Sequence, residues 1–190
     1  MLVRYRALLV AVVAAVAQGG CSDPTRLQSA FPNLEQRRLV YAINGTAITL
    51  PSALSVRSTG VAKVDASFAF DVAFDLDASG AVIAYTQARV ATQLVASHRV
   101  GLQVSDSPFT TITRAPTSGF VYDSLVTLPI GKTLLVDVLE SDCAGSFNGP
   151  NIRAKVAIDS VLTATRSIYL HVLSNPNCGF RSLVQGTPKD

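Results

Sequence analysis

Residues 68–80 read FAFDVAFDLDASG, and this stretch decides the predicted fold. Phenylalanine, valine and leucine occupy every second position from Phe68 to Leu76, and alanine or aspartate fills the positions between them. A period of two places alternate side chains on opposite faces of a β-strand. We therefore predict a strand that buries its apolar face and turns its aspartates toward solvent. A turn at residues 77–80 and a returning strand over residues 81–90 should follow it.

Similar patterns recur further along the chain. Alternating apolar side chains predict strands over residues 99–105 and 152–159, and three adjacent apolar residues at 134–136 predict a central strand. Residues 120–128 and 133–140 are predicted to pair as a hairpin. No segment shows a convincing helical pattern of three turns. The sequence thus predicts an all-β domain, an antiparallel β-sandwich for which an immunoglobulin-like topology is one option.

The first 21 residues, MLVRYRALLVAVVAAVAQGGC, have the layout of an export signal. Arg4 and Arg6 make the start positive, and residues 7–17 form an apolar run shorter than the roughly 20 residues of a membrane-spanning helix. Small residues then precede Cys21. Two cleavage points fit: one after Ala17, which gives a secreted or periplasmic protein, and one before Cys21.

The residues Gln18-Gly19-Gly20-Cys21 resemble the lipobox of bacterial lipoproteins. Gly19 and Gly20 match the small residues of that motif, whereas Gln18 stands where the family prefers an aliphatic residue. The resemblance implies a diacyl or triacyl group, palmitate included, on Cys21. It would anchor the protein to the membrane of the cell envelope, the outer membrane if the host has one.

The three cysteines of the chain favour the cut before Cys21. An odd number of cysteines in an exported protein leaves one thiol unexplained. If Cys21 carries lipid, Cys143 and Cys178 remain as a pair, which is expected to form a disulfide outside the cytoplasm; two free thiols are the alternative. The segment NPNCGFRSL at residues 175–183 resembles a part of uncharacterised β-sandwich lipoproteins, a likeness that implies no activity.

The predicted organisation has four parts. A signal peptide covers residues 1–20, a polar tether 21–38, the sandwich domain 39–186 and a frayed end 187–190. Without the signal, 14 basic residues face 13 acidic ones, so the chain offers no basic face for nucleic acid. Charged residues make up 15% of the sequence and apolar residues 48%, which favours a buried core over disorder.

Residues 75–80 resemble the opening of a calcium-binding loop. Asp75, Asp77 and Ser79 would supply oxygen ligands at positions one, three and five, and glycine follows at position six. The twelfth position is Thr86 instead of a bidentate glutamate. A plain hairpin turn, in which aspartate and glycine serve the turn geometry, is the alternative. Calcium is the one cofactor that the sequence suggests.

No motif in the sequence identifies a catalytic centre. A G-x-S-x-G elbow is absent, and the two histidines are His98 and His171. Tyr85, Gln87 and Arg89 share one face of the predicted returning strand, which suits partner binding, although an ordinary amphipathic surface explains them too. We predict a non-catalytic binding or assembly module at the cell envelope, with an envelope protein or a glycan as partner. A secreted hydrolase of unfamiliar type and a calcium-stabilised adhesion domain are the alternatives.

Overall fold

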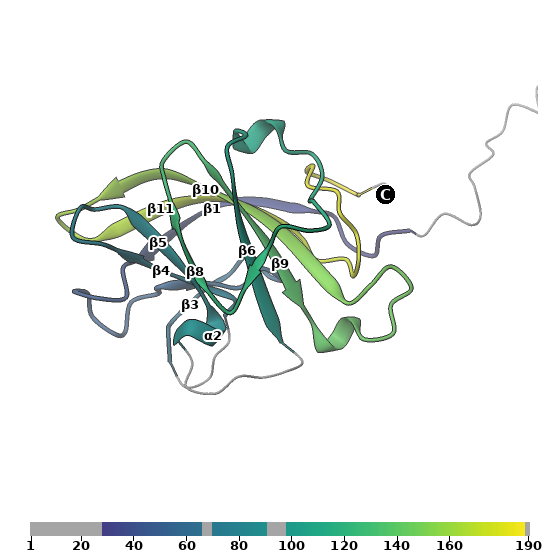
Figure 1. Ribbon diagram of the computed structural model, residues 1–190, viewed down its shortest axis with the longest axis horizontal. Helices are drawn as coiled ribbons and strands as arrows, with labels where there is room; N and C mark the ends of the chain where they lie inside the picture. Colours follow the sequence, from purple (N-terminus) through teal and green to yellow (C-terminus); the bar gives the residue numbers. More distant parts are fainter. Residues whose placement is uncertain (1–27, 66–69, 91–97, 189–190) are drawn as a thin grey trace, which may run out of the picture.

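The computed structural model describes residues 28–65, 70–90 and 98–188, which form two layers of β-sheet (Figure 1). The described strands are β1 (Leu34–Tyr41), β2 (Ala53–Leu54), β3 (Val61–Ala62), β4 (Val72–Leu76), β5 (Val82–Thr86), β6 (Arg99–Ser105), β7 (Val121–Tyr122), β8 (Leu125–Leu128), β9 (Thr133–Leu139), β10 (Asn151–Leu162) and β11 (Ser167–Asn175). Three short helical segments accompany them: α2 (Gln87–Val90), η1 (Phe109–Thr111) and η2 (Ser141–Cys143). Within the described ranges, no helix has the length and apolar character to cross a membrane.

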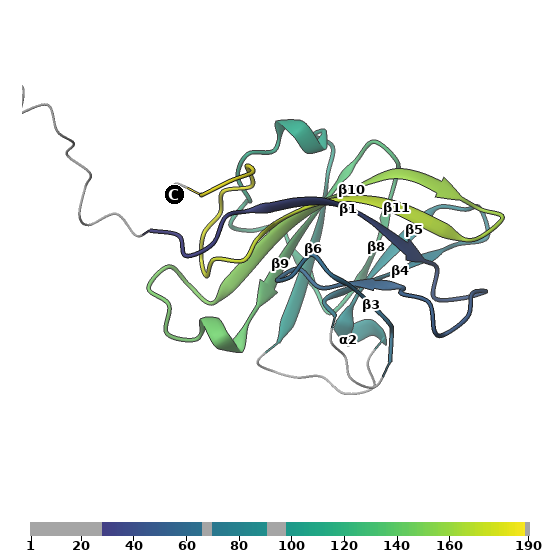
Figure 2. The same ribbon diagram turned by 180° about the vertical axis from the view of Figure 1, so that it is seen from behind.

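The strands form two antiparallel sheets. One sheet has the strand order β1-β11-β10-β9-β6-β7, and the other has the order β3-β2-β4-β5-β8. Figure 2, the view from behind, shows β1 in front, where it runs along β11 at the edge of the larger sheet. The prediction of an all-β, antiparallel sandwich is therefore confirmed.

The main core fills the space between the two sheets. Phe74 of β4 meets side chains such as Leu102 of β6 and Leu134 of β9 in a single cluster, and all three side chains are fully buried. Val72 and Leu76 join Phe74 in this core, as the alternation predicts. The prediction is wrong for Phe70, which packs with Ala73 in a separate cluster because the strand begins only at Val72. Phe68, the first residue of the opening pattern, lies outside the described residues.

A second, smaller core covers the outer face of the larger sheet. Leu135 and Leu173 point away from the main core and pack with Phe109, Ala115 and Leu183. These partners come from the loop around η1 and from the segment that follows β11. The adjacent apolar residues in β9 are explained by burial on both faces of this strand.

The prediction that the aspartates of the opening stretch face solvent is wrong for Asp71 and Asp75. Their exposed fractions are 3% and 4%. Asp75 accepts hydrogen bonds from Arg166 and Asn44, and Asp71 lies 2.9 Å from Nε2 of His98, a contact that raises the pKa of this histidine. Partners from distant segments make the burial of these charges tolerable, and a period of two cannot reveal such partners.

A third buried aspartate, Asp137 of β9, also has charged or polar partners from other strands. Arg153 pairs with its carboxylate at 2.9 Å, and the hydroxyl of Tyr122 donates a hydrogen bond to it at 2.8 Å. Burial and this hydrogen bond raise the pKa of Tyr122 to about 12. The group joins β7, β9 and β10 on the outer face of the larger sheet.

The predicted hairpin between residues 120–128 and 133–140 does not form. β8 pairs with β5 in the smaller sheet, whereas β7 and β9 both pair with β6 in the larger one. The chain therefore changes sheets before β8 and again after it. The backbone of Asp123 has a φ of 54° and that of Gly131 a φ of 85°, so left-handed residues occur at both changes.

The boundaries of the elements also differ from the predictions. β1 begins at Leu34, inside the predicted tether, because polar side chains suit the partly exposed face of an edge strand. The strand β5 ends at Thr86, and helix α2 follows where a continued strand was predicted. At the predicted frayed end, Pro188 is buried and its carbonyl accepts a hydrogen bond from Ser29.

Cys143 and Cys178 form a disulfide, as predicted. The bond joins η2, which follows β9, to the turn that follows β11. Both segments lie at the same end of the larger sheet, where the strands β9 and β10 are connected (Figure 1). The disulfide therefore fixes a loop that the two sheets alone do not hold.

Replacing both Cys143 and Cys178 with alanine should lower the free energy of unfolding by up to about 4 kcal/mol. The two residues are 35 positions apart, and the unfolded chain gains the freedom of the opened loop. Urea unfolding without reductant measures the loss. Dithiothreitol should reproduce it in the wild type and add nothing in the double variant. Equal midpoints for the oxidised wild type and the variant would contradict the prediction.

Candidate functional site

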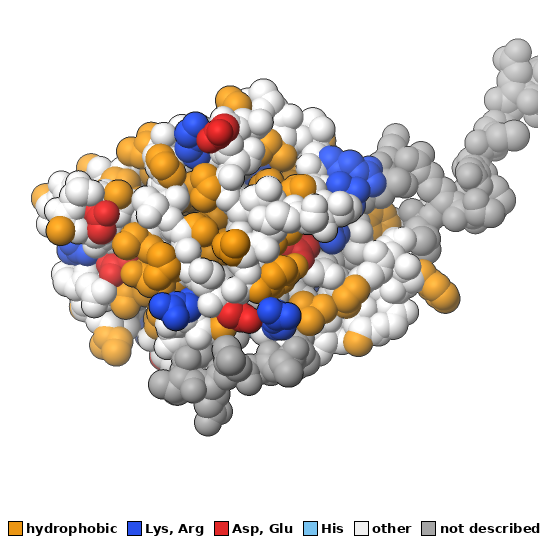
Figure 3. Space-filling view, viewed as in Figure 1, with side chains coloured by type: hydrophobic (Ala, Val, Ile, Leu, Met, Phe, Trp, Pro, Cys, Tyr) orange, Lys and Arg blue, Asp and Glu red, His pale blue; other side chains and the backbone are white. Residues whose placement is uncertain are grey.

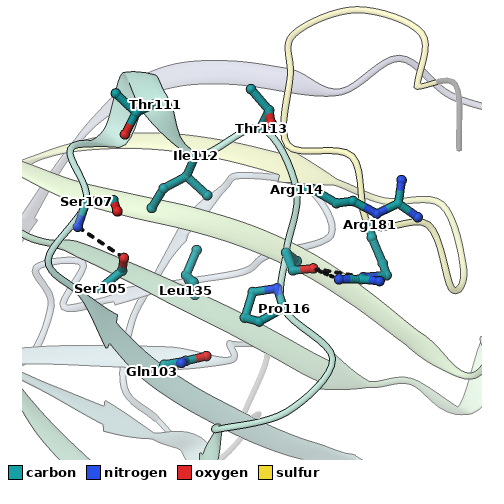
Figure 4. Close-up of a pocket in the computed structure, with 11 residues that line it drawn as sticks. Gln103, Ser105, Ser107, Thr111, Ile112, Thr113, Arg114, Pro116, Leu135 and Arg181 are labelled. Atoms are coloured by element: carbon teal, nitrogen blue, oxygen red, sulfur yellow. Dashed lines mark hydrogen bonds between the residues drawn. The ribbon is translucent and has the colours of Figure 1, made fainter.

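A hollow of about 430 Å³ lies on the outer face of the larger sheet (Figure 4). The strands β6 and β9 form its floor, the loop that contains η1 forms one wall, and the segment after β11 contributes the other side. Its lining combines hydroxyl, amide, guanidinium and apolar groups. None of the described side chains in the lining is acidic.

Side chains of β6 and β9 alternate between the main core and the outer face of the sheet, and those on the outer face form the floor of the hollow. Gln103 and Ser105 face outward, because their neighbours Leu102 and Val104 pack toward the main core. Leu135 adds an apolar surface between them and the wall (Figure 4). A polar ligand seated here would therefore rest on a partly apolar base.

The wall is held in shape by its own hydrogen bonds. The backbone N–H of Ser107 donates to Oγ of Ser105 at 3.2 Å, and the hydroxyl of Thr133 donates to the carbonyl of Ser107 at 2.9 Å. The hydroxyl of Thr111 donates to the carbonyl of Pro108 at 2.9 Å. The loop is thus preformed around the hollow.

Two arginines lie along the side opposite the β6 residues. Arg181 donates from Nε and Nη2 to the carbonyl of Ala115, at 2.8 and 2.5 Å, which clamps the loop to the C-terminal segment. The side chain of Arg114 lies beside that of Arg181 (Figure 4). The described lining thus contains two guanidinium groups and no carboxylate.

Gln103 is the lining residue with an unused acceptor. Among the described residues, its buried Oε1 has no hydrogen-bond partner. The backbone of Gly119 comes so close that a Cβ at this position would lie 2.9 Å from Nε2 of Gln103, and the φ of Gly119 is 90°. The amide group is therefore confined from this side, and its oxygen is buried beneath the surface of the hollow.

A second hollow, of about 250 Å³, lies beside η1 and contains Lys155 and Glu35 in its lining. The exposed fraction of Lys155 is only 4%, and its Nζ donates at 2.8 Å to the carbonyls of Phe109 and Ile112. Burial lowers the pKa of this ammonium group. The ring of His171 stacks on Phe109 with its centroid at 4.1 Å, so these contacts hold η1 on the sheet.

The predicted calcium ligands serve separate roles. Oδ1 of Asp77 accepts hydrogen bonds from the backbone and hydroxyl groups of Ser79 and from the backbone of Ala81; the bond from the Ser79 hydroxyl is the main cause of a lowered pKa at Asp77. Asp75 instead pairs with Arg166 at 3.2 Å. This geometry is that of the plain turn, the alternative that the sequence left open.

The structure does not place Tyr85, Gln87 and Arg89 on one strand face, so that prediction is wrong. Tyr85 packs against a small cluster on the outer face of the smaller sheet. Gln87 is buried in α2 and its Nε2 donates to the carbonyl of Phe70, while Arg89 is exposed. The strand ends at Thr86, and the helical turn then separates the three side chains.

The hollow itself was not predicted from the sequence. Its residues come from three segments, 103–116, Leu135 and Arg181, that only the fold brings together. The two arginines and the run of serine and threonine residues carry no recognisable spacing. Comparison with family models, curated proteins and solved structures finds no match. The predicted lipidation site, Cys21, lies outside the described residues.

The substitution Lys155→Met tests the buried ammonium group. Between its lowered folded pKa and the ordinary value of about 10.5, the unfolded chain binds more protons than the folded one, so wild-type stability rises with pH. Glu35 opposes the shift and itself bonds His171. The wild type should therefore gain stability relative to Lys155→Met in urea unfolding as the pH rises toward 10.5. The exposed Lys63→Met controls for the lost charge, and a pH-independent difference for Lys155→Met would contradict the prediction.

Proposed function

We propose that this protein is a non-catalytic binding module of the bacterial cell envelope, and that it binds an acidic saccharide in the hollow beside η1, β6 and β9. The observation that carries the proposal is the lining. Hydroxyl groups, an amide and two guanidinium groups surround an opening that has no acidic side chain. This combination suits a ligand with many hydroxyls and a negative charge.

The chemistry of each group supports a saccharide ligand. Serine and threonine hydroxyls in the lining both donate and accept hydrogen bonds, as sugar hydroxyls require. Arg114 at the rim can donate to a carboxylate in the paired geometry that guanidinium groups favour. Leu135 and Pro116 offer apolar surface to the C–H face of a sugar ring.

The surroundings of the hollow suit a module that binds without catalysis. In Figure 3 the charged side chains on this face lie in separate small groups, among hydrophobic and uncharged polar surface. Arg181 of the lining donates hydrogen bonds from Nε and Nη2 to a backbone carbonyl. Among the residues that the structure describes, the lining contains no histidine, carboxylate or cysteine to act as a nucleophile or general base.

We also propose that the chain is exported and anchored through lipid on Cys21. The charged start, the short apolar run and the small residues before Cys21 support this location. The bond between Cys143 and Cys178 also supports it, because disulfides persist mainly in oxidising compartments. An anchored module would present its hollow to envelope saccharides.

An array of envelope saccharides in acidic and neutral pairs tests the proposal with the full mature chain. The acidic member of a pair should bind and its neutral counterpart should bind about tenfold more weakly, since a charge-assisted hydrogen bond is lost. Arg114→Gln should cause a similar loss for the acidic member.

The matched control is Arg89→Gln, which removes another exposed arginine, on α2 and away from the hollow. It should leave the affinity unchanged. Equal binding of acidic and neutral saccharides, no binding at all, or equal effects of the two substitutions would contradict the proposal.

A further inference from the structure

We propose that Asp71, His98 and Glu140 form a binding site for a divalent transition-metal ion, with Zn²⁺ as the best-suited probe. One nitrogen or oxygen atom from each of the three side chains lies within 4.8 Å of the others. The site is independent of the saccharide hollow and of the function proposed above.

The fold brings the three residues together from both sheets. Arg99 and Leu139 are paired across β6 and β9, so His98 and Glu140, one position beyond this pair, are neighbours at the end of the larger sheet. Asp71 immediately precedes β4 of the smaller sheet. A metal ion here would connect the two layers of the sandwich at one end.

The contact between His98 and Asp71 is close to the spacing of two metal ligands. Nε2 of His98 lies 2.9 Å from Oδ1 of Asp71, and this buried nitrogen has no other hydrogen-bond partner among the residues that the structure describes. Two ligands about 2.1 Å from a tetrahedral zinc ion are about 3.4 Å apart. The two atoms therefore need to separate by only about 0.5 Å to hold an ion between them.

Asp71 is fixed in place for this role. The backbone N–H of Val56 donates to its Oδ2 at 2.6 Å, which leaves Oδ1 directed at His98. The exposed fraction of Asp71 is 3%, so its charge lies in a poorly solvated position. A second group that orients a ligand in this way is a regular feature of metal sites.

The donor set selects the class of metal. One imidazole nitrogen with two carboxylates favours Zn²⁺ and similar transition-metal ions, because imidazole is a poor ligand for Ca²⁺ or Mg²⁺. The side chains of His98 and Glu140 are exposed by 21% and 15%, so an ion can enter from solvent. Water would complete the coordination.

Arg57 is the opposing charge at this site. Its Nη2 lies 3.6 Å from Oε2 of Glu140 and 3.8 Å from Oδ2 of Asp142. Glu140 must give up this pairing to bind a cation, and Arg57 can keep the pairing with the exposed Asp142. Removing the guanidinium should therefore tighten metal binding, an effect that a purely structural ion pair would not produce.

Isothermal titration of the metal-free mature chain with Zn²⁺ should show one ion bound per chain, and Co²⁺ should give a visible absorption band on binding. His98→Gln should weaken Zn²⁺ binding at least tenfold. The matched control is His171→Gln, since His171 also faces a carboxylate, that of Glu35, at 2.7 Å but belongs to no such cluster within the described part of the chain. It should bind Zn²⁺ like the wild type.

Two further variants separate ligand loss from misfolding. Glu140→Gln should weaken Zn²⁺ binding with an unchanged melting temperature in EDTA, and Arg57→Gln should strengthen it several-fold. Failure of the wild type to bind Zn²⁺ would overturn the proposal. Equal losses in His98→Gln and His171→Gln, or Zn²⁺ affinity unchanged in Glu140→Gln, would do so as well.

Discussion

Buried aspartates with partners from other segments are the constraint on which the rest of this structure depends. Asp71, Asp75 and Asp137 are each less than 5% exposed, and each faces a histidine or arginine distant in sequence. Burying an unpaired carboxylate in these positions would cost folding free energy, so the fold must place a cationic or hydrogen-bonding side chain beside each one. Apolar packing between the sheets supplies much of the stability, and the ion pairs favour one arrangement of the loops around them.

The loops so arranged create the two candidate binding sites. The wall around η1 rests on the outer face of the larger sheet through Phe109 and Lys155, and this support keeps the saccharide hollow open. The proposed metal site uses the buried charge of Asp71. It lies at the end of the larger sheet where β6 begins and β9 ends. In both places a group that stabilises the fold also shapes a surface that can bind.

The sequence predicted the elements of this fold better than their connections. The alternation of apolar and polar residues predicted β4, β6 and β10, because this signal lies within each strand. The number of cysteines predicted the disulfide, because only two remain once Cys21 is set aside. The pairing of β8 with β5 was missed, since the residues between strands do not encode which sheet the chain joins next. The burial of Asp71 and the assembly of Gln103 with Arg181 were missed for the same reason, as both depend on contacts far apart in sequence.

Chemical-shift mapping tests the central claim, that the hollow on the outer face of the larger sheet is the binding surface. The mature chain labelled with ¹⁵N is titrated with the acidic saccharide that binds best. The account predicts that backbone amide signals shift within residues 103–116 and at Arg181, which line the hollow. Shifts confined to Tyr85, Gln87 and Arg89, or to the smaller sheet, would contradict it.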